Sequence, residues 1–131
     1  MTSSSNLRRD PAALLPLTPA MFHVLLSLAE GDKHGYAVLK EVTARTDGEV
    51  ALSTGTLYGL IKRMLADGLI VSPLRRPAAA TAAGAAGHVD ERRHYYRLTD
   101  FGRQVAAAEA ARHERIVHTA RAFRLIPRKA R

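Results

Sequence analysis

The chain has 131 residues, of which 47% are apolar and 24% charged, and it contains no cysteine. These values are typical of one folded domain with a single core, and they exclude disulfide bonds and thiolate zinc sites. The apolar runs are too short to cross a bilayer, and residues 1–17 lack the ordered regions of a signal peptide, so we expect a cytoplasmic protein.

The formal net charge is +8, which favours a polyanionic partner such as nucleic acid, although an anionic lipid surface would also attract it. The basic excess is concentrated in residues 74–97 and 112–131, whereas residues 48–73 carry as many acidic as basic side chains. We therefore expect the electrostatic attraction to come mainly from the two basic segments.

Residues 1–16 are polar at first and then rich in Ala, Leu and Pro, which predicts a flexible N-terminal extension. The first long helix is predicted to begin at Pro19, because Thr18 is a good N-cap and proline at the first helical position loses no hydrogen bond. The segment that follows, as far as Ala29, is apolar on nearly all sides. Such a helix is typical of the centre of a core or of a subunit interface.

A second helix is predicted from about His34 to Thr46, where Asp47-Gly48 ends it. A third helix begins after Ser53, a good N-cap, and ends before Gly68, which lies where a C-cap glycine is expected. Between these ends, apolar residues recur at helical spacing and form one stripe that faces the core: Leu57, Leu60, Ile61, Met64 and Leu65.

The opposite face of this third helix is small, hydroxylated and basic, which suits a surface that enters the major groove of DNA. Hydroxyl groups near the helix start can bond phosphates or base edges, beside the free backbone N–H groups there. Glycines allow a close backbone approach, and basic side chains hold phosphates. A purely capping role for Ser53 and simple packing for Tyr58 remain open. The candidate DNA contacts on this helix are Ser53, Thr54, Gly55, Thr56, Tyr58, Lys62 and Arg63.

Two short strands are predicted on either side of a basic loop, over residues 69–71 and 94–98. The connection over residues 72–91 has many alanines, with Pro and Gly but few large apolar side chains, so we predict a long Ala-rich wing loop. Helix, strand, basic loop and strand is the layout of a winged helix-turn-helix. Tyr95 and Tyr96 alternate in the second strand, so one faces the core and the other the surface, and the pattern leaves open which.

A last helix is predicted to begin after Thr99, which is a good N-cap, and to continue to about Leu125. Its apolar residues are spaced roughly as in a heptad repeat and include many alanines, which permits a close helix–helix approach. We therefore expect a C-terminal dimerisation helix over residues 99–126 and a basic tail over residues 127–131.

Four stretches of the chain form a combination that is specific in its order and spacing, although no single stretch is specific alone. They are His34-Gly35-Tyr36, Ser53–Tyr58, Lys62–Ile70, and Arg92–Thr99 with Gly102. Together they resemble the PadR-like family of transcriptional regulators over about residues 17–104. The single C-terminal helix is similar to that of the short-chain branch of this family.

The layout and the resemblance together predict a mainly α fold with a small two-stranded β-wing. This is a winged helix-turn-helix domain over residues 17–98, followed by the dimerisation helix. The resemblance implies a sequence-specific DNA-binding transcriptional regulator, usually a repressor, that acts as a homodimer on a roughly palindromic operator. Some members respond to small planar ligands, so a small-molecule effector that releases the DNA is a further expectation. The loop over residues 72–91 departs from the family pattern, because the expected wing is short and basic.

Further contacts with DNA and with a second copy are expected outside the third helix. A wing lies along the DNA backbone or probes the minor groove, where arginine is favoured. Arg92 and Arg93 adjoin the second strand and are therefore better candidates than Arg75 and Arg76. In the family, the C-terminal helix typically packs against the partner's N-terminal helix. The candidate dimer contacts are Met21, Phe22, Leu25, Val105, Ala108, Ile116, Ala120 and Phe123.

The sequence indicates neither an enzyme nor a cofactor. It has no Gly-rich phosphate loop, nucleophile elbow or paired-carboxylate arrangement. His113 and His118 are five residues apart and do not share a helix face, so no metal site is expected. The expected partners are duplex DNA and a second copy, with no membrane. The alternative is a winged-helix protein-interaction adaptor whose basic tail binds an acidic partner or a membrane surface and which does not read DNA sequence.

Overall fold

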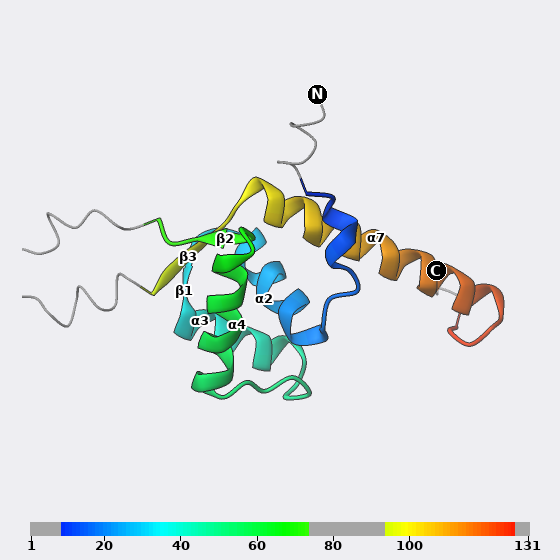
Figure 1. The fold of residues 1–131 in the computed structure, drawn as a ribbon. Coiled ribbons are helices and arrows are strands. Elements are labelled where there is room, and N and C mark those ends of the chain that lie inside the picture. The colour runs from blue at the N-terminus through cyan, green and yellow to red at the C-terminus, as the bar shows by residue number, and fades with distance from the viewer. Residues whose placement is uncertain (1–8, 74–93, 128–131) are drawn as a thin grey trace, which may run out of the picture.

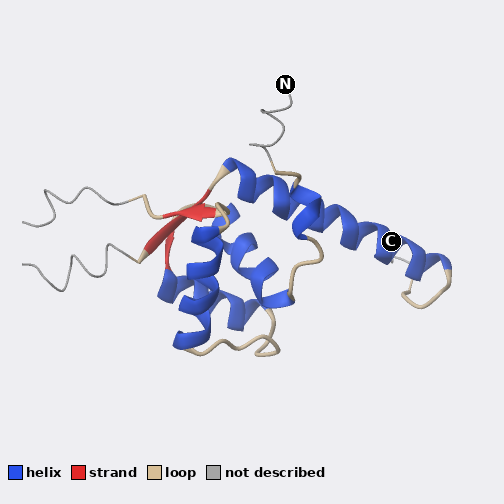
Figure 2. Ribbon diagram, in the orientation of Figure 1, coloured by secondary structure: helices blue, strands red, loops and turns tan. Residues whose placement is uncertain are grey.

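The computed structural model describes residues 9–73 and 94–127 and consists mainly of helices, with three short strands gathered at one side (Figures 1 and 2). The element order begins with a 3-10 helix, η1, and ends with the long helix α7. The bounds are η1 Pro11–Leu14, α2 Pro19–Ala29, β1 Lys33–His34, α3 Gly35–Arg45, α4 Thr54–Ala66, β2 Ile70–Val71, β3 Tyr95–Leu98 and α7 Asp100–Ala122. None of the helices in these two stretches has the length and apolar character that a membrane span requires.

The three strands form an antiparallel sheet in the order β1-β3-β2. The predicted two-stranded wing is therefore correct for β2 and β3, with Val71 opposite Arg97, but the sheet has a third strand. In β1, Lys33 lies opposite Tyr96. β1 has only two residues, too few to show an alternating pattern, and pairing with β3 defines it as a strand. Tyr96 faces the core and Tyr95 the surface, which settles the alternation in β3.

The predicted helix starts are confirmed at the level of individual hydrogen bonds. The side chains of Thr18, Ser53 and Thr99 each accept a bond from the backbone N–H three residues further on. Nδ1 of His34 caps α3 by accepting from the N–H of Tyr36 at 3.0 Å. Local side-chain chemistry therefore determines where all four of these helices begin.

The helix ends use the left-handed backbone region. Gly68 follows α4 with φ 76°, as its position in the sequence predicts. Asp47 follows α3 with φ 59°, and Arg124 follows the end of α7 with φ 61°. After α7, the N–H of Leu125 donates to the carbonyl of Ala120 at 2.9 Å, the long bond of a Schellman motif. The last helix thus ends at Ala122, slightly earlier than predicted.

α2 is the central helix of the core and packs against α3, α7 and β3. This is why α2 is apolar on nearly all sides. The apolar stripe of α4 faces the same core through Leu57, Ile61 and Met64, whereas Leu65 is exposed. The main buried apolar side chains are Met21, Val24, Leu25, Leu28, Val38, Val42, Leu57, Ile61, Met64, Leu69, Ile70, Tyr96, Leu98 and Val105.

Residues 9–16 belong to the fold, in contrast to the flexible extension that composition predicts, while residues 1–8 lie outside the described residues. η1 lies along α7 (Figure 1). The guanidinium of Arg9 donates to the carbonyl of Asp67 at the end of α4 and lies 4.6 Å from the ring centre of Phe101. This segment therefore connects the end of α4 with the start of α7.

The first half of α7 is fixed to the body by two close contacts. A Cβ atom on Gly102 would lie 2.0 Å from the carbonyl oxygen of Leu69, so only glycine allows this approach. One turn beyond the core contact of Val105, the buried carboxylate of Glu109 accepts from the N–H of Leu17 at 3.1 Å. The second half of α7 extends beyond the body (Figure 1).

Candidate nucleic-acid interface

The exposed face of α4 is the candidate DNA-contacting surface. Because Leu57, Ile61 and Met64 point into the core, the positions on the opposite side of the helix point outward. Six of the seven candidate contacts predicted on this helix are exposed: Ser53, Thr54, Gly55, Thr56, Lys62 and Arg63. Gly59 is exposed on the same face. The result is a strip of hydroxyl groups and glycines that leads to two basic side chains.

The hydroxyl groups at the start of α4 are linked to each other. Oγ of Ser53 accepts from the N–H of Thr56 at 3.0 Å and donates to Oγ1 of Thr56 at 2.9 Å. Ser53 thus uses its own proton within the cap, whereas the proton of the Thr56 hydroxyl can point outward. The cap leaves the N–H groups of Thr54 and Gly55 free to donate beyond the helix, which favours an anion at this end.

Gly55 and Gly59 lie one turn apart in open surroundings. A Cβ atom built on either glycine would meet no heavy atom within 4 Å. Neither glycine has a positive φ, so neither is required by the backbone conformation of the free protein. Their small size instead leaves the backbone of α4 accessible to a molecule that approaches this face.

Tyr58 differs from its neighbours because it turns away from this strip and is half-buried. Its ring centre lies 5.0 Å from that of His94, the residue just before β3. Burial raises the pKa of the Tyr58 hydroxyl. The same effect, together with the nearby Tyr58, raises the pKa of Tyr96 to about 12. Tyr58 is therefore packed between elements rather than presented on the exposed face.

Tyr36 and Lys40 extend the candidate surface from α4 onto α3, and the sequence reading did not include them. A pocket of about 640 Å³ lies between the starts of the two helices and includes Tyr36, Lys40 and Thr54 in its lining. The side chain of Tyr36 is 58% exposed, and Nζ of Lys40 lies 5.1 Å from its ring centre. The sequence predicts Lys40 on the wet side of this helix but Tyr36 on its buried side, and the second prediction is wrong. The spacing could have indicated the pair, because Lys40 follows Tyr36 by four residues and the two therefore share a helix face.

The described part of the wing contributes little unpaired positive charge. Arg97 of β3 forms a two-pronged ion pair with Asp32, with nitrogen–oxygen distances of 2.9 to 3.2 Å. This contact raises the pKa of Arg97 through its hydrogen bond to the carboxylate. The predicted wing contacts Arg92 and Arg93, and residues 74–91 of the wing loop, lie outside the described residues.

Comparison with known proteins identifies the family. The family model described as the transcriptional regulator PadR-like family matches residues 24–108. The chain belongs to the PadR-like family. It is also similar to a solved transcriptional regulator from Clostridium thermocellum, with 25% sequence identity, a TM-score of 0.59, and coverage of 79% of this chain and 88% of the other. No curated protein gives a significant match.

The PadR-like match runs from the middle of α2 into the first half of α7, and so includes the whole of α3 and α4 and the described strands. It agrees with the mainly helical fold and its small antiparallel sheet. The protein is therefore a winged-helix transcriptional regulator, and the exposed face of α4 is its candidate recognition surface.

The candidate dimer contacts of this PadR-like chain fall into two groups. Met21, Leu25 and Val105 are buried in the chain's own core, where a partner side chain cannot reach them. Met21 and Leu25 were assigned from the apolar character of α2, and Val105 from the apolar spacing of α7, and the core explains both patterns. The accessible or partly accessible candidates are Phe22, Ala108, Ile116, Ala120 and Phe123.

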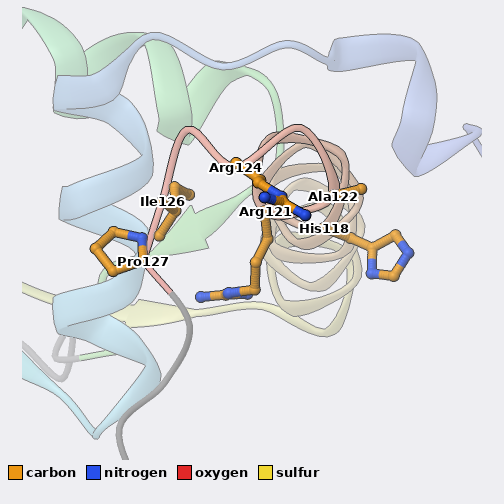
Figure 3. A pocket seen from close by; sticks show the side chains of 6 residues that line it. All are labelled: His118, Arg121, Ala122, Arg124, Ile126 and Pro127. Atoms are coloured by element: carbon orange, nitrogen blue, oxygen red, sulfur yellow. The ribbon is translucent and has the colours of Figure 1, made fainter.

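A second pocket, of about 760 Å³, lies where the PadR-like chain turns back after α7 (Figure 3). Two arginines and a histidine line it, but Figure 3 shows His118 and Arg121 pointing to opposite sides of the helix end. These side chains do not converge on one ligand position. Within the described ranges there is also no group of three His, Asp or Glu side chains that could hold a metal ion.

Proposed function

We propose that this PadR-like regulator is a repressor that binds a roughly palindromic operator as a homodimer. The exposed strip of α4 is the observation that carries the proposal, because its hydroxyl groups, accessible glycines and terminal basic side chains suit insertion into a major groove. In a dimer, two such helices enter successive major grooves about one helical turn, or about 34 Å, apart.

The free half of α7 supports dimer formation. Ile116 is 53% exposed and Phe123 is 71% exposed, and the intervening Ala120 lies on the same helix face. An apolar face of this kind is costly to leave in water and is matched by the same face of a second copy. The proposed dimer contacts are therefore Ile116, Ala120 and Phe123, with Phe22 and Ala108 nearer the body.

A small planar effector belongs to the same proposal. A groove of about 530 Å³ runs along the free half of α7, and Ile116 and Phe123 are among the residues that line it. A ligand bound there would lie on the surface proposed for the second copy. It would act by favouring a spacing of the two DNA-binding heads that does not fit the operator.

The proposal is tested by measuring the affinity for DNA fragments, beginning with the region upstream of the gene itself. Fluorescence anisotropy over a series of salt concentrations gives both the affinity and its salt dependence. We expect tight binding to one fragment, weaker binding to unrelated DNA, and a steep loss of affinity with salt. Arg63→Ala should weaken binding to every sequence and reduce the salt slope by about one unit.

Arg103→Ala is the charge-matched control, because Arg103 is an exposed arginine of α7 and does not belong to the exposed strip of α4. It should leave both quantities unchanged. Failure of the wild-type protein to bind any genomic fragment at low salt would contradict the proposal and favour the adaptor alternative. A reporter gene under the bound promoter then separates repression, with expression rising on deletion of the regulator, from activation.

A further inference from the structure

Three of the four sequence stretches that carry the family resemblance meet at one point of the fold. The N–H of Gly35, at the start of α3, donates to the carbonyl of His94 at 2.8 Å. His94 and Tyr95, where β3 begins, are called the wing base. The ring of His34 lies edge-on to both of their rings, with ring centres 5.8 Å from His94 and 5.3 Å from Tyr95. The ring of Tyr58 of α4 also lies against His94, with ring centres 5.0 Å apart. We call these five residues, His34, Gly35, Tyr58, His94 and Tyr95, the aromatic joint.

The glycine of this joint is required by Tyr58. A Cβ atom on Gly35 would lie 2.5 Å from the Tyr58 hydroxyl oxygen and 3.0 and 3.1 Å from two ring carbons. The 2.5 Å contact is shorter than Cβ atoms show and the other two are tight, so a side chain at position 35 would require the Tyr58 ring to move. The tyrosine ring thus occupies the volume that a side chain on α3 would otherwise take.

The aromatic joint lies where three elements of the DNA-binding head meet. It includes the start of α3, the residue pair His34 and Tyr95 that lie opposite each other in β1 and β3, and a residue in the first half of α4. These are the elements whose relative angles decide whether the face of α4 and the wing can contact one duplex together. The Tyr58 ring is the part of α4 that reaches the other two elements at this point.

We propose that Tyr58 is a positioning residue, whose ring, seated on Gly35 and His94, sets the angle of α4 relative to α3 and the wing base. Its hydroxyl group does not bind DNA. The proposal rests on the proposed DNA-binding function and removes Tyr58 from the predicted list of DNA contacts. Its effect on affinity passes through the orientation of the exposed residues of α4.

A set of four variants tests this role by DNA affinity. Tyr58→Phe keeps the ring and should change the affinity by less than about twofold, whereas Tyr58→Ala should weaken it by about tenfold or more. Gly35→Ala should weaken binding to a similar extent, because it displaces the ring. The double variant Gly35→Ala with Tyr58→Phe should recover much of this loss, because Phe lacks the hydroxyl oxygen that makes the closest contact. Thermal unfolding of each variant checks that the fold is kept.

Amide hydrogen exchange tests the joint without DNA. Exchange at the start of α4 should rise in Tyr58→Ala and Gly35→Ala and stay at the wild-type rate in Tyr58→Phe. If the wild-type protein binds no DNA, the proposed function fails, and this measurement still decides the role of the joint. Two results would overturn the proposal. One is a loss of affinity in Tyr58→Phe equal to that of Tyr58→Ala, with a salt slope lower by about one unit. The other is wild-type affinity and exchange in Gly35→Ala.

Discussion

Glycine has opposite roles at two helical positions of this chain. Gly102 of α7 is enclosed, because the backbone of Leu69 lies where its Cβ atom would be. Gly59 of α4 is open, with no atom within 4 Å of that position. Packing inside the chain explains the first glycine. Packing inside the chain does not explain Gly59, although glycine in an exposed helix costs about 1 kcal/mol of stability relative to alanine.

Gly59→Ala should therefore raise the stability of the free protein and lower its affinity for DNA. The free energy of unfolding should increase by about 0.5 to 1 kcal/mol, since alanine is the better helix former. The added methyl group should reduce the affinity, because it stands between the backbone of α4 and the groove. Urea unfolding and fluorescence anisotropy on the same preparation measure the two effects.

Gly102→Ala is the matched control for this change. The same substitution should lower the free energy of unfolding by about 1 to 3 kcal/mol, because the backbone of Leu69 cannot move aside cheaply. A Gly59→Ala protein that binds DNA as well as the wild type would show that the backbone of α4 does not approach the duplex closely at this position.

Single residues also mark the limit of prediction from the sequence. The chain places Ser53 and Tyr58 close together near the start of α4, and both were candidates for contact with DNA. The side chain of Ser53 can be predicted as a cap, because its partner lies three residues away. The position of Tyr58 depends on Gly35 and His94, which are far from it in sequence. No local pattern indicates that contact.

At the scale of elements, one of the two contacts that attach α7 to the body is a buried carboxylate. Glu109 is fully buried and accepts from Arg112 at 2.7 and 3.0 Å, from His113 at 3.1 Å and from the N–H of Leu17. The hydrogen bond from Arg112 is the main cause that lowers the Glu109 pKa from 4.5 to about 2, against the opposing effect of burial. The charged form is therefore favoured in the folded state.

The depressed pKa predicts how stability depends on pH. The ionised Glu109 stabilises the fold fully above about pH 4.5, and this contribution is lost as the pH falls toward about 2. Glu109→Gln should lower the free energy of unfolding by on the order of 2 kcal/mol at neutral pH. The difference from the wild type should shrink between these two pH values, as urea unfolding at a series of pH values would show.

Glu114→Gln is the control for Glu109→Gln, because Glu114 lies on the same helix and is exposed. It should change stability by less than about 0.5 kcal/mol at every pH. A constant difference between Glu109→Gln and the wild type down to acidic pH would mean that the shape of the side chain, rather than its charge, provides the stabilisation.

The elements themselves were largely predictable, because their limits depend on nearby residues. The caps Thr18, Ser53 and Thr99 and the stop at Gly68 are local signals, and each lies where the sequence predicts. β1 was not predictable in this way, since two residues carry no period and the strand exists through its pairing with β3. The order of residues 9–16 depends likewise on contacts with α7 and the end of α4.

At the scale of the whole molecule, the sequence leaves open which apolar residues face the core and which face a second copy. α2 is apolar on nearly all sides in either case. The structure assigns Met21 and Leu25 to the core and leaves the apolar residues of the free half of α7 uncovered. Ile116 and Phe123, which were predicted as dimer contacts from the same kind of pattern, remain accessible.

Ile116→Glu and Phe123→Glu should each turn the proposed dimer into a monomer, because a charge would be placed in the apolar interface. Sedimentation equilibrium measures the mass of the assembly. DNA affinity should fall as well, since a monomer loses the gain from binding two half-sites together. The thermal unfolding of the head should change little, because both side chains lie outside the core.

His118→Glu is the matched control, because His118 is exposed on α7 about half a turn away from the face of Ile116 and Phe123. It should leave the assembly unchanged. Dissociation of the dimer by His118→Glu, or a monomeric wild-type protein, would contradict the assignment of this face.

The way α7 is attached has a consequence for the geometry of such a dimer. The helix has 23 residues, so it is a rod about 35 Å long. Its first half is held at Gly102 and Glu109, while its far end is free. The 13 residues of α7 beyond Glu109 span about 20 Å, so a tilt of about 5° at Glu109 would move the tip by about 2 Å. A small change in the angle of α7 where it contacts Leu17 and Leu69 would therefore produce a larger change in the distance between the two α4 helices of the proposed dimer.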